Sequence, residues 1–196
     1  MKDLFEDQKE VLRDCVGRFE QLGIDYMLTG SMSMVHYAMM RLTNDIDIVI
    51  EASVRDASKI ISRFEPDYYV PHQRVSDAVA RKFMFNLLHQ QKLVKVDCVV
   101  RKDDLFQKSA FARRTRIRFL DDIDLWIISK EDLILSKLNW AKNTRSEQQM
   151  KDVANILRNG FDGNYVEDWA ARLGVTDLLA ECGKILGENY VEGYDS

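Results

Sequence analysis

The alternation of apolar and polar positions predicts helices and strands mixed through the first two thirds of the chain. Apolar residues recur at helical spacing over 3–22, up to Gly23, and again over 53–64. The segments 24–29 and 45–50 are short apolar runs typical of strands. By the same criteria we expect further strands at 82–89, 93–100, 116–120 and 124–128, and further helices at 33–40 and 104–111. Pro66 and Pro71 indicate a loop after the helix at 53–64.

The last third of the chain carries helical periodicity only. From Lys130 onward, apolar positions recur every three or four residues through two longer and two shorter helices. We therefore predict an α+β fold, with an α/β core over 1–128 and a helical C-terminal region over 129–196 packed on that core.

Composition places the chain among globular proteins of reducing compartments. Its 196 residues are 46% hydrophobic and 31% charged, and charge interrupts every apolar run far short of the roughly 20 residues of a membrane helix. We do not expect the charged start Met1-Lys2-Asp3 to belong to a signal peptide. Cys15, Cys98 and Cys182 form no CxxC pair, so zinc or redox chemistry is not indicated. We expect a cytoplasmic protein without membrane contact.

Charge is unevenly distributed along the chain. The net charge is −4, yet the segment 72–119 holds 12 Lys and Arg against 4 Asp and Glu. Its basic run from Arg113 to Arg118 suits an RNA acceptor, and equally suits the solvated face of an antiparallel strand. The sequence leaves both readings open.

Two carboxylates share one face of a predicted strand. Side chains alternate along a strand, so Asp45 and Asp47 point to one side while Ile46 and Ile48 point to the other. Like charges at this spacing repel unless a cation lies between them, and oxygen ligands suit Mg²⁺ or Mn²⁺. The alternative is an exposed edge strand protected by charge.

A Gly-Ser turn and a third carboxylate complete the pattern. Gly30-Ser31 follows an apolar strand and precedes a helix, where backbone N–H groups and a hydroxyl can bind phosphate. The same pair can also be a simple turn or helix cap. Asp97 lies on a later strand between two apolar neighbours. Its alternative is an ordinary surface aspartate.

Together these elements resemble the nucleotidyltransferase superfamily, whose pattern is a Gly-Ser turn, a helix, an Asp-x-Asp strand and a later strand with a third Asp. The resemblance covers Tyr26 to about Val100. The segment from Glu131 to Leu157 is similar to the helical tail of bacterial nucleotidyltransferase-like proteins. Those proteins are related to the abortive-infection and toxin–antitoxin nucleotidyltransferases of the AbiEii kind.

The resemblance implies roles for particular residues. Asp45, Asp47 and Asp97 would be the catalytic and metal-binding residues, and Asp97 the base. Gly30 and Ser31 would bind the outer phosphates of the nucleotide. Lys137 would also bind nucleotide, although it can equally be solvated or pair with Asp152.

The predicted function is transfer of NMP from an NTP to a hydroxyl of RNA, protein or a small molecule, in a toxin–antitoxin or phage-defence setting. Its partners would be the NTP, an unidentified acceptor, and an antitoxin or other partner protein. The alternative is a non-catalytic module of the same fold that binds a nucleotide or a partner protein. A third reading, an RNA-binding protein, depends on the basic middle segment.

Overall fold

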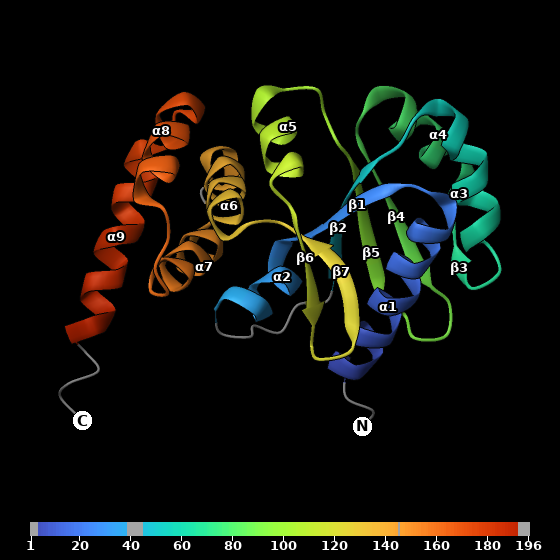
Figure 1. Cartoon of the computed structure of the whole chain (residues 1–196), viewed down its shortest axis with the longest axis horizontal. Coiled ribbons are helices and arrows are strands. Elements are labelled where there is room, and N and C mark those ends of the chain that lie inside the picture. Colours follow the sequence, from blue (N-terminus) through green and yellow to red (C-terminus); the bar gives the residue numbers. More distant parts are fainter. Residues whose placement is uncertain (1–3, 39–44, 145, 192–196) are drawn as a thin grey trace. The chain divides into compact units, whose positions relative to one another are not determined.

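The computed structural model describes residues 4–38, 45–144 and 146–191 (Figure 1). The chain divides into two compact units. The sheet unit comprises Met1–Ser33 and Arg41–Ile128, and the helical unit comprises Met34–Met40 and Ser129–Ser196.

A mixed seven-stranded sheet forms the centre of the sheet unit. Its order is β3-β4-β5-β2-β1-β7-β6. Strand β2 pairs with β1 in antiparallel and with β5 in parallel orientation. The strands are β1 (Asp25–Thr29), β2 (Asp45–Glu51), β3 (Tyr68–Tyr69), β4 (Met84–His89), β5 (Lys95–Val100), β6 (Thr115–Phe119) and β7 (Ile123–Ile127). The predicted α+β class is confirmed.

Helices pack on this sheet from the side of its apolar face. Helix α1 contacts β1 and α3, and α4 contacts α3 and β4 (Figure 1). Ile46, Ile48 and Ile50 are fully buried, and so are Cys98 on β5 and Cys15 on α1. The helices of the unit are α1 (Leu4–Leu22), α3 (Ala57–Phe64), α4 (His72–Arg81) and α5 (Leu105–Ala112), with the 3-10 turn η1 at Val54–Asp56.

The sequence prediction missed two elements in this unit. Pro66 and Pro71 indicated a loop, but β3 lies between them and α4 begins directly after Pro71. Val75, Ala78 and Val79 form the buried side of α4, at helical spacing. Lys82, predicted to open a strand, ends this helix in a left-handed conformation instead.

The helical unit contains helices where the sequence predicted them, but α9, expected to be one of two shorter helices, spans 16 residues against 15 for α6. α6 packs on α7, α8 and α9, and α9 also packs on α7 and α8. Polar side chains cap the starts of α7 and α8: Ser146 accepts from the Gln149 N–H before α7, and Asp162 from the Tyr165 N–H before α8. Their bounds are α6 (Lys130–Thr144), α7 (Glu147–Leu157), α8 (Gly163–Leu173) and α9 (Thr176–Val191). Among the described residues, no helix is both long and apolar enough to cross a membrane.

Helix α2 (Gly30–Tyr37) begins in the sheet unit and continues into the helical unit. It starts at Gly30, three residues earlier than predicted, because Gly30 itself adopts the positive φ that leads from β1 into the helix. Within the helical unit, the Asn159 side chain donates to the Tyr37 carbonyl at 2.8 Å. Met39 and Met40, the end of the predicted helix, lie outside the described residues.

Candidate active site

The backbone of Gly30 lies directly against the side chain of Asp47. Thr29, the last residue of β1, pairs with Asp47 across the antiparallel β1–β2 ladder. Gly30 has φ +66°, and a Cβ added there would lie 1.9 Å from Asp47 Oδ2 and 2.7 Å from Asp47 Cβ. Only glycine therefore fits between the end of β1 and this carboxylate.

The same turn begins helix α2 beside the carboxylates. The Ser33 hydroxyl donates to the Gly30 carbonyl at 2.8 Å, which closes the first turn of the helix. Ser31 is buried, at 8% exposure. Since the first N–H groups of a helix and its dipole favour an anion, the start of α2 has the chemistry of a phosphate site.

The three predicted site aspartates lie on one face of two neighbouring strands. In the parallel β2–β5 ladder, Asp47 pairs with Asp97 and Asp45 pairs with Lys95. Both strands bury every second residue, and all three aspartates occupy the half-buried face opposite the apolar one. The register thus brings together residues that are 52 positions apart in the sequence.

A lysine lies between two of these carboxylates. Lys95 Nζ is 3.0 Å from Asp45 Oδ2 and 3.1 Å from Asp97 Oδ2. Burial acts to lower the pKa of Lys95, but the hydrogen bonds to Asp45 and Asp97 outweigh it and the pKa is raised. The other oxygen of Asp97 accepts a hydrogen bond from Asn86 Nδ2 at 2.5 Å, across the β4–β5 ladder.

The sequence analysis identified neither Lys95 nor Asn86. Lys95 precedes Asp97 by two positions, so strand alternation already placed both on one face. Asn86 could not be found in this way, because its pairing with Asp97 depends on the register of β4 against β5.

The donor set suits a hard divalent cation, although the carboxylates are not gathered around a common point. Among the described residues, no three His, Cys, Asp or Glu side chains form a group ready to hold a metal ion. Asp45 and Asp97 instead share the ammonium of Lys95, a positive charge in contact with both. Carboxylate oxygens on one face, bridged by a cation, fit Mg²⁺ or Mn²⁺ chemically.

Lys137 lies in the helical unit, in a buried ion pair. Its Nζ is 2.8 Å from Asp152 Oδ2, with the two side chains 4% and 1% exposed. It also donates to Gln149 Oε1 at 3.1 Å, and Gln148 donates to the other oxygen of Asp152 at 2.9 Å. The pairing with Asp152 that the sequence left open is therefore observed, and nucleotide binding by Lys137 stays a prediction.

Comparison with known structures identifies the fold. The chain is similar to an antigenic nucleotidyltransferase-like protein from Paracoccidioides brasiliensis, with a TM-score of 0.54, 15% identity, and coverage of 89% of this chain and 93% of that one. It is also similar to the lincosamide antibiotic adenylyltransferase LnuA in its lincomycin-bound form, with a TM-score of 0.51, 17% identity, and coverage of 79% and 97%. The chain has the nucleotidyltransferase fold. No protein-family model and no curated protein matches it.

Within this nucleotidyltransferase fold, the basic run follows the end of α5 into strand β6. Arg114 lies over the rings of Phe111 and Trp126, with its guanidinium carbon 4.2 and 4.9 Å from their centroids. Arg116 and Arg118 lie on the exposed side of β6, as the solvated-face interpretation requires. RNA binding by these residues stays a prediction.

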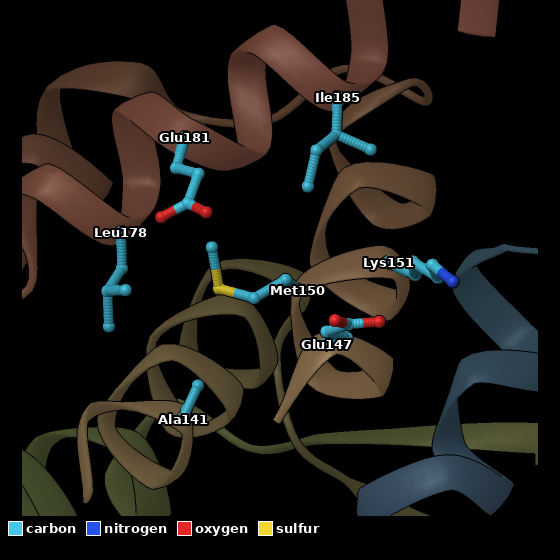
Figure 2. Close-up of a pocket in the computed structure, with 7 residues that line it drawn as sticks. All are labelled: Ala141, Glu147, Met150, Lys151, Leu178, Glu181 and Ile185. Carbon is cyan, nitrogen blue, oxygen red and sulfur yellow. The ribbon is translucent and has the colours of Figure 1, made fainter. Parts of the chain in front are cut away.

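The helical unit contains a separate pocket of about 360 Å³ (Figure 2). Its apolar side chains include Met150 at the centre, with Leu178 and Ile185 from α9 around it, and Glu181 points its carboxylate toward Met150 (Figure 2). Glu147 and Lys151 from α7 add charge to the lining, and the pocket contains none of the predicted site residues.

Proposed function

We propose that this chain is a metal-dependent nucleotidyltransferase that transfers NMP from an NTP to a hydroxyl acceptor. The observation that carries the proposal is the approach of Gly30 to Asp47, with no room for a Cβ between them. It brings the start of a helix, which favours phosphate, next to carboxylates, which favour the cation that accompanies an NTP.

The proposed reaction assigns each residue a step. An acceptor hydroxyl oxygen attacks the α-phosphorus, the bond from that phosphorus to the bridging oxygen breaks, and pyrophosphate leaves. Asp97 takes the proton of the hydroxyl, while Gly30 and Ser31 hold the outer phosphates. Asp45, Asp47 and Asp97 would hold Mg²⁺ or Mn²⁺, which when bound neutralises the developing charge.

The proposal also includes a role for Lys137 and a class of acceptor. Lys137 is included as a predicted nucleotide ligand, and to bind nucleotide it would have to do so from its buried pair with Asp152.

The acceptor is RNA, a protein or a small molecule. The likeness to a protein described as a lincosamide antibiotic adenylyltransferase favours testing small-molecule hydroxyls first. A toxin–antitoxin or phage-defence setting, with an antitoxin partner, rests on the sequence resemblance.

The second candidate is a non-catalytic module of the same fold. One observation favours it: the ammonium of Lys95 already pairs with two of the three carboxylates. Such a module would bind a nucleotide or a partner protein without releasing pyrophosphate.

Pyrophosphate release separates the two candidates. The purified chain is incubated with each NTP, Mg²⁺ or Mn²⁺, and a panel of RNA, protein and small-molecule acceptors. We expect acceptor-dependent release that falls by at least about a hundredfold in Asp47→Asn, since a lost ligand to the charge-neutralising cation removes transition-state stabilisation. Asp124→Asn, an exposed carboxylate on β7 of the same sheet, is the matched control and should keep full activity.

Thermal unfolding supplies a readout without turnover. An NTP with Mg²⁺ binds only the folded chain, so it should raise the melting temperature of the wild type and of Asp124→Asn, and not that of Asp47→Asn. A ligand-dependent rise with no pyrophosphate release from any acceptor would favour the module over the enzyme.

A further inference from the structure

We infer that Lys95 competes with the divalent cation for the site carboxylates and leaves them when metal and nucleotide bind together. The inference rests on the proposed function, because it assigns the three aspartates to a metal site. It adds a residue that sets how strongly that site binds metal without nucleotide.

The geometry places the lysine ammonium where a shared cation would lie. Lys95 pairs with Asp45 in the β2–β5 register and stands two positions before Asp97 on the same face of β5. Its Nζ contacts one oxygen of each, at 3.0 and 3.1 Å. Both belong to the set of three carboxylates that we propose to hold the metal.

Two cations cannot share these oxygens at close range. A Mg²⁺ ion binds carboxylate oxygen at about 2.1 Å, so a metal on Asp45 and Asp97 would lie within a few ångströms of the ammonium and repel it strongly. Metal binding therefore requires Lys95 to give up both contacts, which weakens the apparent affinity for the metal. The phosphates of an NTP offer the displaced ammonium a new partner, and this compensates the loss.

Lys95 and Asp97 differ in exposure in the way this exchange requires. The Lys95 side chain is 39% exposed and has a long flexible stem, so it can turn toward solvent or phosphate. Asp97 is 14% exposed, and Asn86 holds its other oxygen. The carboxylate thus stays in place while the lysine leaves.

The test measures binding of Mn²⁺ alone to the full chain, by calorimetry and by the paramagnetic resonance of free Mn²⁺. Lys95→Met should bind Mn²⁺ about two- to thirtyfold more tightly than wild type, the range expected for removing two partly exposed ion pairs. Lys95→Arg, which keeps the charge, should bind as weakly as wild type.

Lys92→Met is the matched control. Lys92 lies on the turn of the same hairpin and also pairs with two carboxylates, Asp7 at 2.8 Å and Glu10. Its substitution makes the same change in net charge, so a general electrostatic effect would tighten Mn²⁺ binding in both variants, whereas direct competition tightens it only in Lys95→Met.

The outcomes also separate this inference from the proposed function. Unchanged or weaker Mn²⁺ binding in Lys95→Met, or equal tightening in Lys92→Met, overturns the competition even if the wild type transfers NMP. Tighter binding in Lys95→Met alone, with no pyrophosphate release, supports the competition while the proposed enzyme fails. Absence of Mn²⁺ binding in every variant overturns both.

Discussion

At the scale of single residues, Gly30 brings the backbone into contact with Asp47, one of the candidate site carboxylates. Its positive φ is a conformation in which other residues are strained, and the neighbouring carboxylate removes the space for a side chain as well. Gly23 provides a natural comparison, because it has φ +65° and nothing within 4 Å of an added Cβ. The two glycines share the positive φ, and Gly30 alone of the two has a neighbouring side chain in the way of a Cβ.

We expect Gly30→Ala to lower the free energy of unfolding more than Gly23→Ala. The latter should cost about 1–2 kcal/mol for the left-handed backbone alone. In Gly30→Ala the new methyl also displaces Asp47, so the rise in melting temperature with NTP and Mg²⁺ should disappear, whereas Gly23→Ala should keep it. Urea denaturation and thermal unfolding measure the two effects. Equal costs and equal ligand responses would show that the Gly30–Asp47 contact has no role.

At the scale of elements, one ion pair connects α6 to α7 inside the helical unit. Lys137 and Asp152 are almost wholly buried, so each charge depends on the other and on the two flanking glutamines for compensation. Arg172 and Asp168 form a comparable contact at 2.8 Å within α8, but both are more than half exposed. Burial should therefore decide how much the loss of each pair lowers the free energy of unfolding.

Lys137→Met should lower the free energy of unfolding by about 3–5 kcal/mol, because it leaves Asp152 buried without its partner. Arg172→Met, the exposed control, should cost less than about 1 kcal/mol. The double variant Lys137→Met/Asp152→Leu should recover much of the loss. If Lys137 also binds nucleotide, as predicted, the double variant will still lack the thermal response to NTP. Urea denaturation of all three variants is the measurement, and a cost below about 1 kcal/mol for Lys137→Met would contradict the buried pairing.

At the scale of the whole molecule, all three cysteines are buried free thiols, spread over both units. Burial raises the pKa of Cys15 to about 12 and that of Cys98 well above its ordinary value. In the folded chain these thiols therefore stay protonated and unreactive. Their role is to fill apolar space, consistent with the absence of a CxxC pair in the sequence.

Stability should consequently fall at alkaline pH. The unfolded chain ionises Cys15 near its ordinary pKa of 9.0, whereas the folded chain keeps it protonated to about 12. Above pH 9 the unfolded state binds fewer protons, so the free energy of unfolding should decrease as the pH rises from 9 toward 12. Urea denaturation at several pH values measures this slope, and Cys15→Ala should make it shallower.

A thiol reagent at pH 8 should label the native chain slowly, whereas in denaturant it should label all three cysteines. Rapid native labelling would contradict the burial.

Sequence patterns alone determined the α+β class, most of the elements, and the face on which Asp45, Asp47 and Asp97 lie. They could do so because helical and strand periodicities are local properties of the chain, and because strand alternation fixes which neighbours point together. The helix α4 carried the same kind of signal in Val75, Ala78 and Val79. It was missed because two prolines suggested a loop around it.

The tertiary structure decided which distant residues are in contact. Three contacts depend on strand order and register. They are the contact of Gly30 with Asp47, the ion pairs of Lys95 with two carboxylates, and the hydrogen bond from Asn86 to Asp97. Likewise, Lys137 could have been solvated or bound to phosphate, and its burial against Asp152 followed only from the packing of α6 on α7. Pairings between residues distant in the chain depend on how elements dock, and no local pattern encodes that choice.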